Sequence, residues 1–194
     1  MPRAEQTPAA PKLSKAQVAA LQVFLDRNGV SPGVIDGRMG SNVNKALDAW
    51  FEETGERVDP ADTDLIVRRL AASGGLAFTT YTITSEDAAG PFIASIPSDY
   101  ADKAKLDHLA YTSTVEMLAE RFHMDEDFLI LLNPEAKFEL GEIITVADAG
   151  PSLEGEVARI EIRKTDRRAV VFDVSGKMLA NYPVSIGSVE TPSP

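Results

Sequence analysis

The spacing of apolar residues changes twice along the chain, and this change limits the possible fold more than any other feature. From about 13 to 72, apolar residues recur every three or four positions, which is typical of helices that bury one face. From about 73 to 155, helical and strand patterns are mixed. From 156 onward, apolar and polar residues alternate, as in half-buried strands. We therefore expect an α+β multidomain chain with small modules in series.

Three helices are expected between 13 and 72. Ser14 is placed to cap the first, with Gln17 completing a capping box, and Asn28-Gly29 is placed to end it. A second helix should open at about Ser41. A third should begin at Asp59-Pro60, where Asp caps and Pro fits the first turn. The apolar faces comprise Val18, Leu21 and Leu25, then Val43, Ala46, Leu47, Trp50 and Phe51, then Ile66 and Leu70.

The loop between the first two helices carries Gly33, Gly37 and Gly40, with Asp36 directly before Gly37. One interpretation of these residues is purely structural: Asp36 caps a turn, and the glycines permit positive φ. The segment nevertheless resembles the three-helix peptidoglycan-binding domain attached to many cell-wall hydrolases and transpeptidases. The resemblance rests on Leu21-Gln22, Leu25, Gly29, Gly33, Asp36-Gly37, Gly40 and Ala46-Leu47. It implies a peptidoglycan-binding site at Asp36, Gly37 and Arg38.

Residues 73–155 combine two strand patterns with two helix patterns. Thr80 to Thr84 is rich in β-branched and aromatic residues, and Ile143 to Val146 is a second apolar strand. Helical periodicity lies between them, in 115–122 and 128–132, and Asn133-Pro134 should end the second helix. This order resembles the LysM glycan-binding module, a βααβ unit, here with an irregular insertion at 85–110.

The LysM resemblance implies glycan contacts at two places. They are Thr112, Ser113 and Thr114 before the module's first helix, and Asn133, Pro134 and Glu135 after its second. Capping of that first helix is an alternative role for Ser113 or Thr114. We interpret His123 as filling a half-buried, satisfied site. One hypothesis for the insertion is a lid over the groove of a catalytic domain.

Residues 156–194 are expected to form an antiparallel meander. Ala158, Ile160 and Ile162 should share the buried face of its first strand. Further strands are expected at 169–174 and 178–186, joined by a Ser175-Gly176 turn. Three short strands do not bury a stable core alone, so they either pack on the LysM-like module or belong to a domain that continues past 194.

A second family resemblance favours continuation. The residues that carry it are Ile160-Glu161-Ile162, Val170-Val171-Phe172, Gly176-Lys177, Tyr182 to Gly187, Ser188 to Glu190 and Thr191-Pro192. They resemble the opening strands of the YkuD-type L,D-transpeptidase catalytic domain, so 156–194 would be the start of an incomplete β domain. In that family the catalytic His and Cys lie well downstream, and no position here inherits a catalytic role.

Composition excludes several function classes. The chain has no cysteine and only two histidines, so a thiolate nucleophile, a disulfide and a zinc–thiolate site are all impossible within it. Its net charge of −11 lies in residues 73–155, which hold 4 Lys and Arg against 15 Asp and Glu. That charge disfavours nucleic acid and anionic lipid as partners. No stretch approaches a membrane span, and no metal or cofactor site is expected.

Together the resemblances imply the N-terminal targeting portion of a peptidoglycan cross-linking enzyme of the cell envelope or periplasm. Residues 1–12 contain prolines and no apolar run, so they are interpreted as a flexible leader, and an export signal is expected upstream of them. The parent enzyme would transfer an acyl group through a Cys thiolate, while residues 13–155 hold it on peptidoglycan. The alternatives are a non-catalytic wall-binding adaptor and a pair of degenerate modules that bind other proteins.

Overall fold

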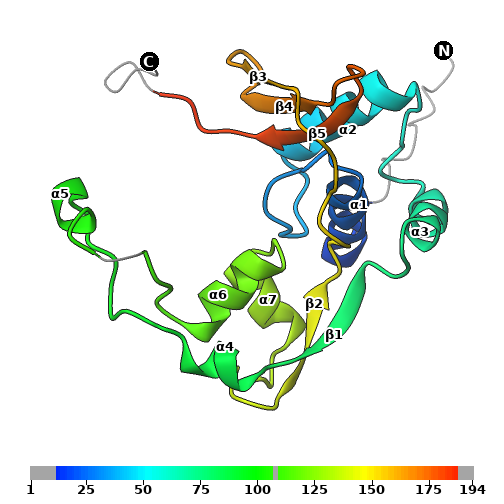
Figure 1. Cartoon of the computed structure of the whole chain (residues 1–194). Helices are drawn as coiled ribbons and strands as arrows, with labels where there is room; N and C mark the ends of the chain where they lie inside the picture. Colours follow the sequence, from blue (N-terminus) through cyan, green and yellow to red (C-terminus); the bar gives the residue numbers. More distant parts are fainter. Residues whose placement is uncertain (1–11, 107–108, 188–194) are drawn as a thin grey trace, which may run out of the picture.

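The structure is a computed structural model that describes residues 12–106 and 109–187. Within these residues the chain is a mixed α+β fold, with seven helices and two small antiparallel sheets. Figure 1 shows two lobes joined at one side: an upper lobe (residues 12–72 and 158–187) and a lower lobe (residues 78–106 and 109–147). No helix in the described ranges combines the length and apolar character needed to cross a bilayer.

The first helix begins and ends where local signals predict, and the second begins where they predict. Helix α1 (Lys15–Arg27) has Ser14 as N-cap with the expected capping box, and Asn28 follows as C-cap. Helix α2 (Ser41–Thr54) ends at Gly55, whose left-handed φ of 72° suits a residue without a side chain. The predicted start of the third helix is wrong. Helix α3 (Thr63–Ala72) begins after Asp62, whose carboxylate accepts a hydrogen bond from the backbone N–H of Leu65.

The lower lobe has the expected order of strand, helices and strand. Strands β1 (Phe78–Thr82) and β2 (Ile143–Ala147) pair antiparallel over their whole length. Helices α6 (Thr114–Arg121) and α7 (Glu126–Leu132) lie between them in sequence. Leu118, Leu129 and Ile144 are almost completely buried and belong to one hydrophobic core with the upper-lobe residues Phe24 and Leu25. The two lobes therefore share a continuous apolar interior.

The insertion is more ordered than an irregular stretch. It contains helix α4 (Ser85–Ala89), capped by Thr84, and helix α5 (Tyr100–Lys103), capped by Asp99. A bridge between Phe92 and Tyr111 closes the base of the segment. Beyond this base, α5 stands at the end of an arm that projects from the lower lobe (Figure 1).

The second sheet packs on the upper lobe, whereas the sequence suggested packing on the LysM-like module or a domain that continues past 194. Strands β3 (Arg159–Arg163), β4 (Arg168–Phe172) and β5 (Met178–Pro183) form an antiparallel meander in sequence order, with the turn at Ser175-Gly176 as predicted. The meander packs on α2 and on the loop after α1, in the upper lobe. Ser188 to Glu190 and Thr191-Pro192, which carry part of the second family resemblance, lie outside the described residues.

The prediction of a buried Ile face on β3 is also wrong. Ile160 and Ile162 are 60% and 55% exposed. The opposite face of the sheet is the covered one, and it holds Val170, Arg168 and Asn181, which are all buried. Alternation shows that a strand has two different faces, but it does not show which face a helix will cover.

The loop at 28–40 holds the parts of the molecule together. Val30 forms a parallel bridge with Asn181 of β5, and Ile35 forms one with Met124 of the lower lobe. The buried guanidinium of Arg168 adds hydrogen bonds to the carbonyl of Ser31 and to the Asn181 side chain. The same short loop is thus paired on one side with the meander and on the other with the lower lobe.

Arg27, at the end of α1, makes a second link between the lobes. Its side chain is 2% exposed and is ion-paired with Asp148, which follows β2. It also donates hydrogen bonds to the backbone carbonyls of Asp148, Leu70, Gly75 and Leu76. One guanidinium therefore joins α1 to both segments that connect the lobes, the one after α3 and the one after β2.

Candidate functional site

The structure places the nine residues predicted from the two module resemblances at three separate positions. The first group, Asp36, Gly37 and Arg38, lies against α1. The Asp36 carboxylate accepts hydrogen bonds from Gln22 Nε2 and from the backbone N–H of Arg38, both at 2.9 Å. Gln22 Oε1 accepts the N–H of Gly37 at 2.9 Å. Gln22 is itself buried, so the hydrogen bonds that join the turn to α1 lie in the interior of the protein.

Within this turn the backbone approaches α1 too closely for a side chain at Gly37. A Cβ there would stand 2.7 Å from the carbonyl oxygen of Lys15, and the φ of 67° already favours glycine. Gly40 differs from the expectation, because it is the extended N-cap residue of α2, with a φ of −135°. Only the side chain of Arg38 in this group is exposed and without a hydrogen bond among the described residues.

The second group, Thr112, Ser113 and Thr114, begins α6. The Ser113 hydroxyl accepts the backbone N–H of Glu116, which is the arrangement of a helix N-cap. Glu116 in turn accepts hydrogen bonds from the backbone N–H and the hydroxyl of Thr112, both at 2.6 Å. These bonds lower the pKa of the Glu116 carboxyl and close the start of the helix.

The third group, Asn133, Pro134 and Glu135, lies at the end of α7. The buried amide of Asn133 binds the backbone of both α7 and β2, through Leu129 and Thr145. An open cavity of about 300 Å³ lies beside it, lined by Asn133, Pro134, Glu135, Ala136, Glu142 and Ile143. Residues 112–114 do not line this cavity, so the structure does not bring the two predicted glycan-contacting groups into one pocket.

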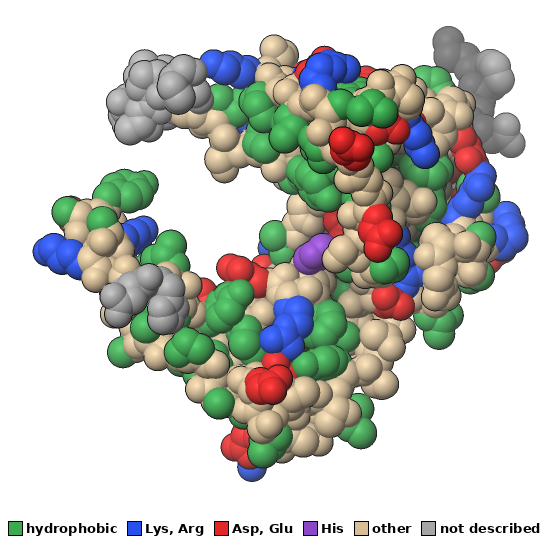
Figure 2. Space-filling model, viewed as in Figure 1, with side chains coloured by type: hydrophobic (Ala, Val, Ile, Leu, Met, Phe, Trp, Pro, Cys, Tyr) green, Lys and Arg blue, Asp and Glu red, His purple; other side chains and the backbone are tan. Residues whose placement is uncertain are grey.

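The site that sequence reasoning missed lies where the lobes meet. His123, from the turn after α6, lies with its Nδ1 atom 2.7 Å from a carboxylate oxygen of Asp26 on α1. The Asp26 side chain is 6% exposed and that of His123 is 54% exposed. Figure 2 shows a hollow between the lobes.

Backbone bonds hold His123 in this place. Its φ of 57° is left-handed, which is uncommon for any residue other than glycine. Its carbonyl accepts the N–H of Ile35, and Ile35 in turn accepts the N–H of Asp125. The hydrogen bond with Asp26 raises the pKa of His123 above its ordinary value, while burial opposes the rise. The junction therefore favours the positively charged imidazole.

Two adjoining cavities share this junction. One, of about 390 Å³, is lined by Asp26, Ser31, Gly33, Val34, Ala119, Glu120, His123, Met124 and Tyr182. The other, of about 450 Å³, is lined by Asp26, Arg27, Arg121, His123, Ala149, Gly150, Pro151, Ser152, Leu153 and Tyr182. Together they form what we call the junction cleft. Burial, and then the charge of Asp26, raises the pKa of Tyr182.

The pair of His123 and Asp26 has the orientation of a general base, but the described residues supply no nucleophile for it. Ser31 and Ser152 line the cleft, yet neither hydroxyl is hydrogen-bonded to the imidazole, and the Ser31 oxygen accepts the N–H of Gly33. The same described residues contain no cluster of three or more potential metal-ligating side chains.

One sequence signal could have pointed to the junction. Asp26 is an acid in the last turn of α1, where the helix dipole favours a cation, so it needs a compensating positive partner. That partner, His123, lies 97 residues away in sequence. Comparison with known proteins adds no relative, because no protein-family model and no curated protein matches the chain.

Proposed function

We propose that the chain binds peptidoglycan and is the targeting portion of a cell-envelope L,D-transpeptidase. The observation that carries the proposal is the lower lobe, in which β1 and β2 pair in full and α6 and α7 lie between them in sequence. This is the order of the LysM-like module on which the sequence resemblance rests. The insertion leaves β1 after Thr82 and returns before α6, so it does not interrupt the strand pairing.

The cavity beside Asn133 supports a contact surface at the end of this lobe. Glu135 supplies an exposed carboxylate and Ile143 an apolar side chain that is 71% exposed. A polysaccharide presents both hydroxyl groups and apolar ring faces, so a shallow site with acceptors and apolar surface suits it. The chain has no cysteine, so in this proposal the acyl-transfer nucleophile belongs to another part of the parent enzyme.

Co-sedimentation with purified sacculi tests the proposal. The chain should be retained, and the double variant Glu135→Ala, Ile143→Ala should bind at least about fivefold more weakly, the loss expected for about 1 kcal/mol of contacts. Glu139→Ala, Leu140→Ala is the matched control, since both side chains are exposed and neither lines the cavity. Wild-type protein that remains in the supernatant would overturn the proposed function. If the wild type and both variants are retained equally, the cavity beside Asn133 is not the surface that binds peptidoglycan.

A further inference from the structure

Three hydrogen-bond donors from different elements line the larger cavity of the junction cleft. Arg121 is the last residue of α6, His123 follows in the next turn, and Tyr182 comes from β5 of the upper lobe. Their convergence requires the two lobes to be docked. Side chains from separate elements that meet at a lobe boundary are a common setting for ligand sites.

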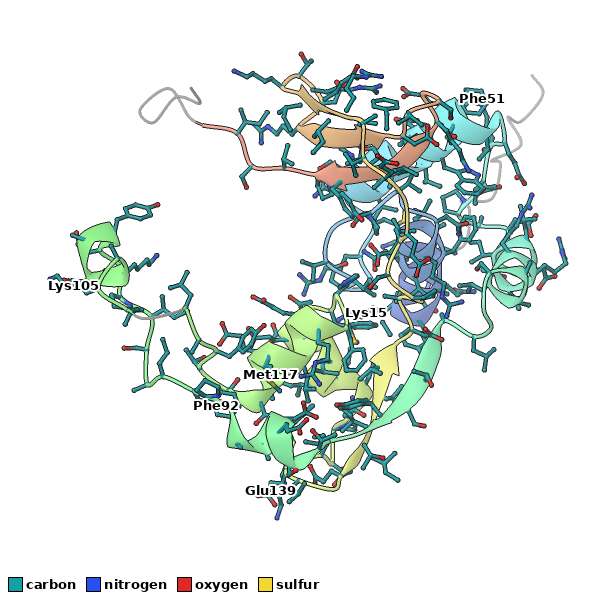
Figure 3. All side chains as sticks on the ribbon, in the orientation of Figure 1. Lys15, Phe51, Phe92, Lys105, Met117 and Glu139 are labelled. Carbon is teal, nitrogen blue, oxygen red and sulfur yellow. The ribbon has the colours of Figure 1, made fainter. Side chains whose placement is uncertain are left out.

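Each donor keeps capacity for a further partner. Arg121 binds Asp87 and Tyr81 through Nη1, while its Nη2 contacts only the Met117 sulfur at 3.9 Å. Figure 3 marks Met117 on α6 in the lower lobe. His123 uses Nδ1 for Asp26, which leaves Nε2 for a ligand. The hydroxyl of Tyr182 has no hydrogen-bond partner among the described residues.

The unused donors around this cavity favour a group that accepts hydrogen bonds, such as a carboxylate. Its lining holds two arginines and the histidine against one carboxylate, that of Asp26. Asp26 is already engaged by His123, and Arg27 by Asp148. Arg121 remains 42% exposed although it is paired with Asp87. Each cation is thus paired with a carboxylate, and what Arg121 and His123 still offer a ligand is unused N–H donors for charge-assisted hydrogen bonds.

The smaller cavity adds an apolar requirement. It shares Asp26, His123 and Tyr182 with the larger one and continues past Ala119, Val34 and Met124. Val34 is 56% exposed although it lies beside this hollow, so an apolar group of a ligand could cover it. A ligand that fills both cavities therefore needs an anionic end and a neighbouring apolar branch.

We propose that the junction cleft binds the carboxylate end of a short peptide. The terminal carboxylate receives hydrogen bonds from Arg121, His123 and Tyr182, and the last side chain, which is apolar, enters the cavity beside Val34 and Met124. This inference stands on the cleft alone. If the proposed function holds, the short peptide is a stem peptide of peptidoglycan, and this identification alone rests on the proposed function.

Titration of the chain with acetyl-Ala-Leu tests the inference, with binding followed by calorimetry. The free acid should bind at least about tenfold more tightly than its C-terminal amide, because the amide loses the charge-assisted bonds. Acetyl-Ala-Gly should bind more weakly than acetyl-Ala-Leu, because it lacks the apolar branch. Equal binding of acid and amide, or no binding of either, would overturn the proposal.

Three variants, one of them a control, test the location of the site. Ser152→Trp fills the larger cavity from an exposed position and should abolish binding, whereas Ser98→Trp, on the exposed part of the insertion, should leave it unchanged. Tyr182→Phe keeps the ring and should weaken the acid severalfold. Unchanged urea midpoints confirm that each variant is folded. If Ser152→Trp still binds the peptide, the peptide binds outside the junction cleft. If inorganic phosphate binds more tightly than the peptide acid, the ligand is a phosphate and the peptide proposal is overturned.

The outcome separates this inference from the proposed function. Retention on sacculi without peptide binding would remove the inference and leave the proposed function in place. Peptide binding without retention on sacculi would do the opposite.

Discussion

Replacing Arg27 with methionine should destabilise the whole molecule by about 3 kcal/mol. Methionine keeps much of the apolar stem but removes an ion pair and four hydrogen bonds to backbone carbonyls. Breaking a buried ion pair costs about 3–5 kcal/mol when its partner is left uncompensated. Here the Asp148 side chain is 36% exposed and can be rehydrated, which places the expected loss at the lower end.

Urea unfolding measures this loss. With a slope of about 2 kcal/mol per molar, the midpoint should fall by about 1.5 M at unchanged slope. Arg68→Met is the matched control, because Arg68 is an exposed residue of α3, and it should change stability by less than about 0.5 kcal/mol. Asp148→Asn keeps the backbone carbonyl that Arg27 binds and should lose only about 1 kcal/mol. An Arg27→Met protein as stable as Arg68→Met would refute the reasoning that this side chain joins the lobes.

Two further predictions concern protonation. Burial would raise the pKa of Asp87, but hydrogen bonds from Tyr81, the Thr84 backbone and Arg121 hold it at about 2. Its contribution of about 2 kcal/mol is present above the ordinary carboxyl pKa and lost as the pH falls to about 2. Urea unfolding should therefore show Asp87→Asn less stable than wild type at pH 5, with the gap closing by pH 2; a constant gap would contradict this assignment. The raised pKa of His123 means that the charged pair with Asp26 stabilises the junction below the ordinary histidine pKa and weakens as the pH rises through the raised value. Proton NMR of a His108→Gln protein should give a pKa above 6.5, lowered by Asp26→Asn, and titration at or below 6.5 would exclude the ion pair.

Local signals in the sequence were sufficient for much of the secondary structure. Ser14 and Gln17 form their capping box, and Ser113 caps α6, because a cap depends only on residues three or four positions apart. The predicted start of α3 is wrong because Asp59 and Asp62 both offer a capping carboxylate. Asp59 instead accepts the N–H of Ala61 in a turn, and Asp62 caps the helix. Two equivalent signals three residues apart cannot be separated without the geometry of the turn.

The tertiary arrangement depended on contacts that sequence patterns do not encode. The alternation on β3 shows two faces, but α2 covers the face opposite to Ile160, and nothing near β3 in sequence signals this. The junction of Asp26 and His123 joins residues 97 positions apart, so it could not be found by spacing. Of the predicted site residues, Asn133 and Ser113 make structural hydrogen bonds, and residues 134–135 line an open cavity. Whether any of them contacts glycan stays a prediction.

The pairing of the loop at 28–40 with both neighbours has a consequence for dissecting the protein. A fragment that ends at residue 72 would leave Val30 and Ile35, which are completely buried in the whole chain, without their strand partners. A fragment that begins at 73 would lose the α1 residues that share its core. Domain exchange by cutting at the linkers should therefore yield insoluble pieces. Any graft of the lower lobe onto another protein would have to carry α1 and its loop with it.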